Sequence, residues 1–303
     1  MNDLALLTRF TGEIAALTAA FLWSIASVIY SKVGQKIPPI GLNLIKGVIA
    51  LGFLGLTLGV RGGEFPPVSG VIIGLLLISG MIGIGVGDSA YFATLNCLGP
   101  RRALLMETLA PPLTAILALI FLQERLSTWA WGGILLTILG VAWVVTERFT
   151  LGTIPDSLQW QGLGYGLIAE LCQAVGVTLS RYALTQTSIS PLWSTSLRLL
   201  GGVSILVLWL VMSPGNSQRL LRPLGSRPVV GIITLATFLG TFLGIWLQQT
   251  AFKFTAAGIA QALSSTSPLF VLPIAISMGD RVSLRALLGA LVAILGIILL
   301  FQG

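Results

Sequence analysis

Histidine is absent from this 303-residue chain, and charged residues are scarce. Lys and Arg together number 17 and Asp and Glu 10, or 9% of the sequence, where a soluble globular chain has about 25%. So few charges do not solvate a protein surface, and with 55% hydrophobic residues the chain is expected to lie mostly in lipid. The net charge of +7 forms no basic cluster, which argues against nucleic-acid binding.

The missing residue types exclude several chemistries. Without histidine, the protein forms no Ser-His-Asp triad, no His-ligated metal site and no imidazole proton relay. The two cysteines, Cys97 and Cys172, lie far apart without CxxC spacing, which favours buried apolar residues over a disulfide or a reactive thiol. No GxxxxGK[ST] loop is present, so the chain carries no ATPase of its own. We therefore expect no metal and no cofactor.

Long apolar segments dominate what is present. A helix that crosses the roughly 30 Å hydrocarbon core of a bilayer needs about 20 apolar residues, and polar, Pro or Gly breaks divide the chain into ten such segments. Only the connections around 147–160 and 213–228 exceed ten residues. The sequence predicts an all-α membrane protein with ten transmembrane helices at 13–32, 40–60, 70–97, 102–122, 128–146, 161–183, 191–212, 229–251, 256–277 and 284–301.

The two halves of the chain resemble each other. At an offset of 156, Pro112 falls on Pro268, and the sequence ERLS that begins at Glu124 falls on DRVS at 280–283. Earlier in the halves, Lys46 falls on Arg198 at an offset of 152. This self-similarity predicts two five-helix repeats, at 13–146 and 161–301, joined by a linker at 147–160.

An odd number of spans per repeat has a geometric consequence. The second repeat must enter the membrane from the opposite side, so the repeats are predicted to be inverted about an axis in the membrane plane. Many secondary transporters have this architecture and bind substrate at the midplane between the repeats. A passive channel is one alternative. A membrane-embedded enzyme is another, although no paired aspartates and no Ser/Lys or Cys/His set are visible.

The repeated blocks also resemble a known family. The paired P-L…(E/D)-R-x-S…G…G blocks, Trp23-Ser24 in the first helix, and the basic residues Lys46 and Arg198 are similar to the drug/metabolite transporter superfamily, in particular its ten-helix EamA-type branch. Lys46 departs from the family pattern, where an arginine is expected. The resemblance implies a carrier that exports or exchanges a small metabolite or drug by alternating access, driven by proton or substrate gradients. We expect a monomer or homodimer in the inner (plasma) membrane of the cell.

Charged residues inside the spans are the strongest clue to a transport site, because each is costly to bury in hydrocarbon unless it is paired or hydrated. Polar partners follow one helical turn away, as Tyr91 follows Asp88 and Gln173 follows Glu170, so each pair marks a polar stripe turned from lipid toward a central cavity. The predicted substrate-binding or coupling residues are Glu170, Gln173, Glu107, Asp88, Tyr91, Lys46, Arg198, Trp23, Gln248 and Gln261.

Structural interpretations compete with these assignments. Lys46 and Arg198 can snorkel to the membrane interface from positions near helix ends, and Glu170 can form a static ion pair. Pro111 and Pro112 cannot donate a hydrogen bond to the carbonyl groups four residues back, those of Glu107 and Thr108, which either face a polar cavity or only mark a packing kink.

The sequence gives conflicting indications of orientation. Ten spans put both termini on one side, together with five Lys and Arg residues, while ten such residues fall on the opposite side. The positive-inside rule therefore predicts termini outside the cell, whereas the family resemblance implies termini in the cytoplasm.

Overall fold

The computed structural model describes residues 9–33, 37–61, 64–98, 103, 106–146, 156–212, 227–277 and 284–301. Every regular element within these ranges is helical, and each of the ten predicted segments contains helix, so the predicted all-α fold is confirmed. By length and composition, six of the described helical spans are long and apolar enough to cross a membrane. Shorter apolar helices cover 110–122, 128–144 and 284–300.

The helices follow the predicted order. The first repeat contains α2 (Thr11–Val33), α3 (Pro39–Val60), α4 (Gly70–Gly80), η2 (Met81–Gly87), α5 (Asp88–Leu98), α7 (Ala110–Leu117), η3 (Ala118–Leu122) and α8 (Thr128–Thr146). The second contains α9 (Asp156–Gln186), α10 (Pro191–Met212), α12 (Arg227–Ala236), η6 (Thr237–Leu243), α13 (Gly244–Phe254), α14 (Ala257–Ser264), α15 (Ser267–Ser277) and α16 (Leu284–Leu300). Helix α9 begins inside the segment predicted as a linker, while residues 147–155 of that segment and the second acidic turn at 280–283 lie outside the described residues.

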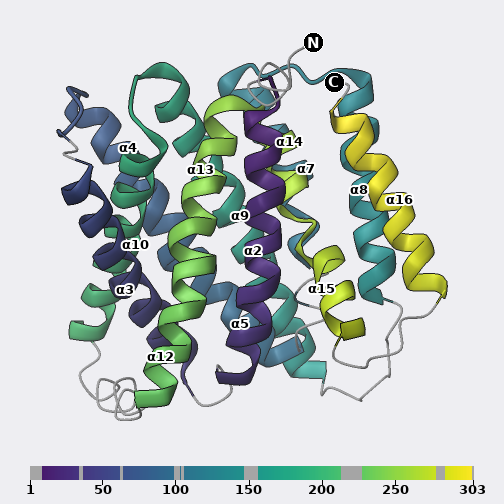
Figure 1. Cartoon of the computed structure of the whole chain (residues 1–303), viewed down its shortest axis with the longest axis horizontal. Helices are drawn as coiled ribbons and strands as arrows, with labels where there is room; N and C mark the ends of the chain where they lie inside the picture. Colours follow the sequence, from purple (N-terminus) through teal and green to yellow (C-terminus); the bar gives the residue numbers. More distant parts are fainter. Residues whose placement is uncertain are drawn as a thin grey trace.

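The two repeats are inverted relative to each other. Helix α2 begins and α16 ends at the same end of the bundle, as an even number of spans requires (Figure 1). The equivalent helices α3 and α10 each contain 22 residues and each begin with proline. They start from opposite ends of the bundle (Figure 1). We call the end at which α2 begins the terminal end, and the other the distal end.

The duplication extends to irregularities of the backbone. The third and eighth spans are each interrupted by a π-helical segment of seven residues, η2 and η6, whose bounds differ by the repeat offset (237 − 81 = 156). A π segment is rare and leaves the usual hydrogen-bond ladder of the helix out of register. In both copies a side chain from another helix donates to the carbonyl oxygen at the same repeat position: Asn43 Nδ2 to Ile84 at 2.9 Å, and Trp23 Nε1 to Gly240 at 2.7 Å.

The predicted proline breaks also occur in both repeats. The fourth span turns at Thr108 and Leu109 just before its two prolines, and the ninth turns at Ser265 and Thr266 just before Pro268. At the second break, Ser267 Oγ donates to the Ser264 carbonyl oxygen at 3.2 Å. Local hydroxyl groups therefore satisfy the carbonyl that proline frees, as polar side chains do in other interrupted membrane helices.

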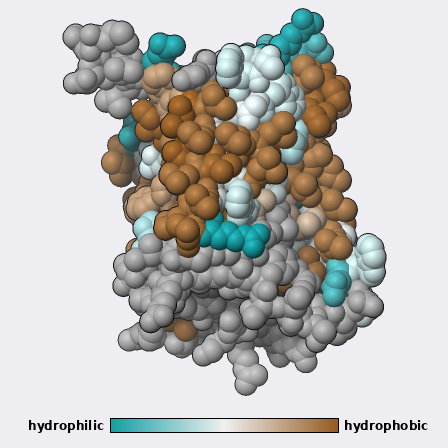
Figure 2. Space-filling model, turned by 90° about the vertical axis from the view of Figure 1, so that its right-hand side faces the viewer, coloured by the Kyte–Doolittle hydropathy of each residue, from teal (hydrophilic) through white to brown (hydrophobic). Residues whose placement is uncertain are grey.

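A broad apolar surface surrounds the bundle. Figure 2 shows this surface over α8 and α16, the pair of helices at the right of Figure 1. Large exposed side chains there include Leu135, Leu139, Leu291 and Leu295, each more than half exposed. Such an area is far too large for a soluble monomer and is expected where helices face lipid tails.

Glycines allow helices of the two repeats to cross closely, as small residues do at many membrane helix contacts. A Cβ atom on Gly80 would overlap the backbone of Arg198, and one on Gly201 would overlap the backbone of Leu77, so α4 and α10 touch through their main chains. This contact fixes the height of Arg198 relative to the π segment η2. Glycines of the third and seventh spans therefore have a packing role.

We expect Gly80→Ala to destabilise the protein by roughly 1–3 kcal/mol, the usual cost of adding a methyl group to a filled contact. Thermal unfolding of the detergent-solubilised protein measures the effect. Gly74→Ala is the matched control, because a Cβ atom on Gly74 of the same helix would meet nothing within 4 Å. Equal melting temperatures for the two variants would contradict the close crossing.

Candidate transport site

A buried ion pair joins the second and third helices of the first repeat. Lys46 Nζ lies 2.7 Å from Asp88 Oδ2, with the two side chains 11% and 17% exposed. The second oxygen of the carboxylate, Oδ1, accepts a hydrogen bond of 3.3 Å from Gln173 Nε2 on α9. The ammonium group of Lys46 also lies 5.0 Å from the ring centre of Phe92, within cation–π range. Asp88 thus connects the first repeat to the second.

Lys46 and Arg198 occupy equivalent positions in the two repeats. Each stands seven residues after the first residue of its helix (46 − 39 and 198 − 191), or about 10 Å along the axis at 1.5 Å per residue. Lys46 is 8% and Arg198 only 2% exposed. Both side chains therefore lie buried within the bundle, which favours a role inside the protein over snorkelling.

Three acidic groups lie near one another in this region. The Tyr91 hydroxyl and the Glu107 carboxyl lie close enough to interact, which brings α5 next to the fourth span. Glu170, in the middle of α9 and 3% exposed, interacts electrostatically with both Glu107 and Asp88. Within the described part of the chain, no cation lies at ion-pair distance from Glu170. Among the described residues, Glu170 therefore does not form the permanent salt bridge that is its structural alternative.

The predicted site residues divide into two groups. Lys46, Asp88, Tyr91, Glu107, Glu170, Gln173 and Arg198 form one connected set, which we call the charged cluster. The other three have no described contact with this cluster. The indole N–H of Trp23 bonds to η6, whereas Gln248 on α13 and Gln261 on α14 are buried, at 8% and 7% exposed. A substrate role for these three residues stays a prediction.

The predicted site residues did not include several side chains that support the cluster. Asn43, one turn before Lys46, donates to the Ile84 carbonyl oxygen and to Ser89 Oγ, so it attaches α3 to the π segment that precedes Asp88. Phe92 lies under the Lys46 ammonium group. A polar residue at i−3 from Lys46 was a usable signal for Asn43, but nothing in the sequence predicts a π segment at 81–87.

The acidic turn after the fourth span forms a second polar contact. Glu124 Oε1 lies 2.6 Å from Arg181 Nε on α9, and Glu124 Oε2 accepts a 2.9 Å hydrogen bond from the backbone N–H of Ala257 at the start of α14. Arg181 Nη1 also donates to the Phe252 carbonyl oxygen. We call this contact the clasp. Ser127 of the same turn accepts from the Ala130 N–H at 3.0 Å, close to the start of α8.

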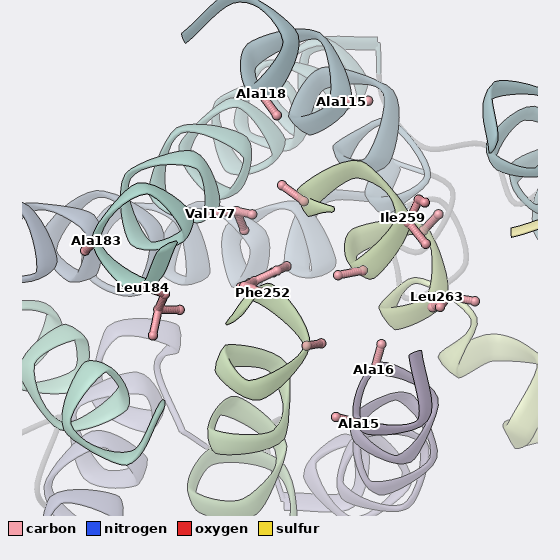
Figure 3. Close-up of a cluster of buried hydrophobic side chains, with 14 of the residues drawn as sticks. Ala15, Ala16, Ala115, Ala118, Val177, Ala183, Leu184, Phe252, Ile259 and Leu263 are labelled. Carbon is pink, nitrogen blue, oxygen red and sulfur yellow. The ribbon is translucent and has the colours of Figure 1, made fainter. Parts of the chain in front are cut away.

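A buried apolar layer lies next to the clasp. Buried side chains of nine of the ten spans meet in it. They include Ala15, Val177, Phe252 and Leu263 (Figure 3). All four are at most 5% exposed. Because this layer lies near the start of α2 and the ends of α9 and α13, the clasp and the layer lie together at the terminal end of the bundle.

We expect Lys46→Met to destabilise the protein by roughly 3–5 kcal/mol, because it leaves the Asp88 carboxylate buried without its cation. The double variant Lys46→Met/Asp88→Asn should recover most of that loss, since it removes both charges together. Thermal unfolding in detergent provides the measurement. Lys253→Met is the control, because Lys253 donates to the Ile189 carbonyl oxygen and not to a carboxylate. Additive losses in the double variant would contradict the pairing.

Two inverted repeats of apolar helices, with charged groups buried between them, define an integral membrane protein with many spans and the architecture of a secondary transporter. The EamA-like transporter family model matches residues 10–146 and 160–302. The chain therefore belongs to the EamA-like transporter family, a branch of the drug/metabolite transporter superfamily, and it is a membrane transporter and not an enzyme.

Relatives of similar length agree with this assignment. An "Uncharacterized transporter" from Archaeoglobus fulgidus is 27% identical over 293 residues, which cover 95% of this chain and 96% of the relative. The "Uncharacterized transporter YyaM" of Bacillus subtilis is 28% identical over 227 residues, or 73% of this chain and 71% of the relative. A protein of known crystal structure superposes with a TM-score of 0.77 over 96% of both chains at 16% identity, which supports the fold alone.

Proposed function

We propose that this protein is a secondary active transporter that exports or exchanges a small metabolite or drug by alternating access, with the charged cluster as its transport site. The observation that carries the proposal is the location of the cluster. Its residues come from α3, α5 and the fourth span of the first repeat and from α9 and α10 of the second. A group bound there contacts both repeats, so a relative movement of the repeats can expose it to either side of the membrane.

Closure of one end supports the same mechanism. The clasp and its apolar layer cover the terminal end, and alternating access requires that such a barrier open in another conformation of the carrier. The clasp suits a reversible barrier because its ion pair and its hydrogen bonds to backbone groups can be exchanged for hydrogen bonds to water when the end opens.

Protons are the proposed coupling ions. Glu170 and Glu107 are carboxyl groups within the spans, near each other and near Asp88. Mutual repulsion disfavours ionisation of all three groups at once, so one of them can take up and release a proton as its surroundings change. Glu170 is the stronger candidate of the two, since the Tyr91 hydroxyl interacts with the carboxyl group of Glu107.

Counterflow in liposomes tests the proposal. Purified protein is reconstituted, the liposomes are loaded with one unlabelled metabolite at a time, and uptake of the same labelled compound is followed. A carrier gives a transient, saturable accumulation for its substrate. A flux that never saturates and shows no accumulation would indicate a passive channel, and no flux for any compound in a broad metabolite panel would contradict the proposal.

A further inference from the structure

Arg198 is the largest side chain that lies fully buried in the described structure, with 2% of its surface exposed. Its Nε and Nη1 atoms are buried and have no hydrogen-bond partner among the described residues. A guanidinium group carries five N–H donors in a planar fork. A buried cation with unused donors is costly, and such donors match the two oxygens of a carboxylate.

The neighbouring carboxylate is already engaged. Asp88 attracts Arg198 electrostatically, but its two oxygens accept from Lys46 at 2.7 Å and from Gln173 at 3.3 Å. Of the two repeat-equivalent cations, Lys46 therefore has its counter-ion within the protein, and Arg198 has none at ion-pair distance in the described part of the chain.

The π segment brings the guanidinium group beside the backbone of the third span. A Cβ atom on Gly83 would lie 3.2 Å from Arg198 Nη2 and 3.7 Å from Gln173 Oε1. The glycine thus leaves room where the guanidinium, the Gln173 amide and the main chain of η2 meet. All three belong to the interface between the repeats, the region to which the transport site is assigned.

We propose that Arg198 receives a carboxylate group of the transported molecule, which makes the substrate a small organic acid or a molecule with one carboxylate. The inference rests on the proposed carrier function. A group with a single negative charge suits the site because, of the two cations in the charged cluster, only Arg198 lacks a counter-ion among the described residues. The carboxyl groups of Asp88, Glu107 and Glu170 nearby oppose a second negative charge, which disfavours a phosphate dianion.

Binding to the purified full-length protein tests the proposal directly. Thermal unfolding is recorded in acetate and benzoate, in their neutral amides acetamide and benzamide, and in inorganic phosphate, each against chloride at equal ionic strength. A ligand that binds only the folded state raises the melting temperature. The carboxylates should raise it, whereas the amides and phosphate should match chloride. Equal shifts for acid and amide, or a larger shift for phosphate, would overturn the proposal.

Variants assign the effect to Arg198. We expect Arg198→Gln to weaken carboxylate binding at least about tenfold and Arg198→Lys to weaken it less, because lysine keeps the charge but loses the planar fork. Arg61→Gln is the control, since Arg61 is an exposed arginine beside the Trp246 ring. If Arg198→Gln does not fold, the wild-type comparison and Arg198→Lys still decide. Unchanged carboxylate shifts in Arg198→Lys would then reject the assignment.

Counterflow separates this inference from the proposed function. Saturable counterflow of a neutral or cationic compound without a carboxylate, unaffected by benzoate, would leave the carrier function in place and reject the anion site. Stabilisation by carboxylates without counterflow of any compound would support the Arg198 site and reject the carrier.

Discussion

Glu170→Gln is expected to abolish uptake driven by a pH gradient while leaving counterflow of the substrate within about threefold of wild type. Glutamine keeps the shape and hydrogen-bonding capacity of the protonated carboxyl group but cannot release a proton. Counterflow exchanges substrate for substrate and needs no net proton movement, whereas a pH gradient drives net transport only if a proton moves with each cycle. The two activities should therefore separate in a single variant.

Liposomes with matched and opposed internal pH provide the measurement, with folded yield recorded in parallel. Gln248→Ala is the control, because Gln248 is also a buried polar side chain but lies outside the charged cluster. It should leave the ratio of the two activities unchanged. If Glu170→Gln loses both activities equally and folds poorly, Glu170 has a structural role and the coupling assignment fails.

Locking the clasp is expected to reduce transport by more than about tenfold. Glu124 and Arg181 are replaced by cysteine in a Cys97→Ser/Cys172→Ser background, and the protein is reconstituted in liposomes. A membrane-permeant, reducible bifunctional thiol reagent then cross-links the two cysteines at the terminal end. If the terminal end must open once in each cycle, the bridge holds one conformation and stops the cycle. Reduction of the bridge should restore the rate measured before cross-linking.

The two single-cysteine variants, Glu124→Cys and Arg181→Cys, control for the loss of the native ion pair and for modification itself. Treated with the same reagent, each should keep the transport rate of its untreated form. Full transport by the bridged protein would mean that the clasp remains closed throughout the cycle, and the terminal end would then not be a gate.

Hydrophobicity and internal repetition were sufficient to predict the fold. The predicted 191–212 and 128–146 segments coincide with α10 and α8, because apolar runs bounded by proline or polar residues leave little choice of helix ends in a membrane. Helix α9 extends further than predicted, to Asp156–Gln186, since amphipathic turns beyond the lipid core carry no strong hydropathy signal. The π segments escaped prediction; two of them, η2 and η6, accept hydrogen bonds from the distant residues Asn43 and Trp23, a tertiary contact that hydropathy does not reveal.

The candidate site was accessible to sequence reasoning only in part. The cost of burying charge identified Lys46, Asp88, Glu107, Glu170 and Arg198 as unusual, and the structure brings all five into one region. Which cation pairs with Asp88 could not be predicted, because Lys46 and Arg198 are equivalent by repeat symmetry. The clasp was missed because Glu124 and Arg181 lie in different repeats, near helix ends where charges are common.

The central claim is that the two ends of the protein open in turn, and distances between spin labels test it most directly. One pair of labels, at Arg125 and Thr185, spans the terminal end beside the clasp. The other, at Asn96 on α5 and Ile232 on α12, spans the distal end. All four positions are exposed.

Double electron–electron resonance in lipid nanodiscs should show two populations of distances for each pair of labels. As pH or substrate changes, the longer distance at the terminal end should accompany the shorter distance at the distal end. Fixed distances at both ends, or lengthening of both together as in a channel that opens, would contradict alternating access.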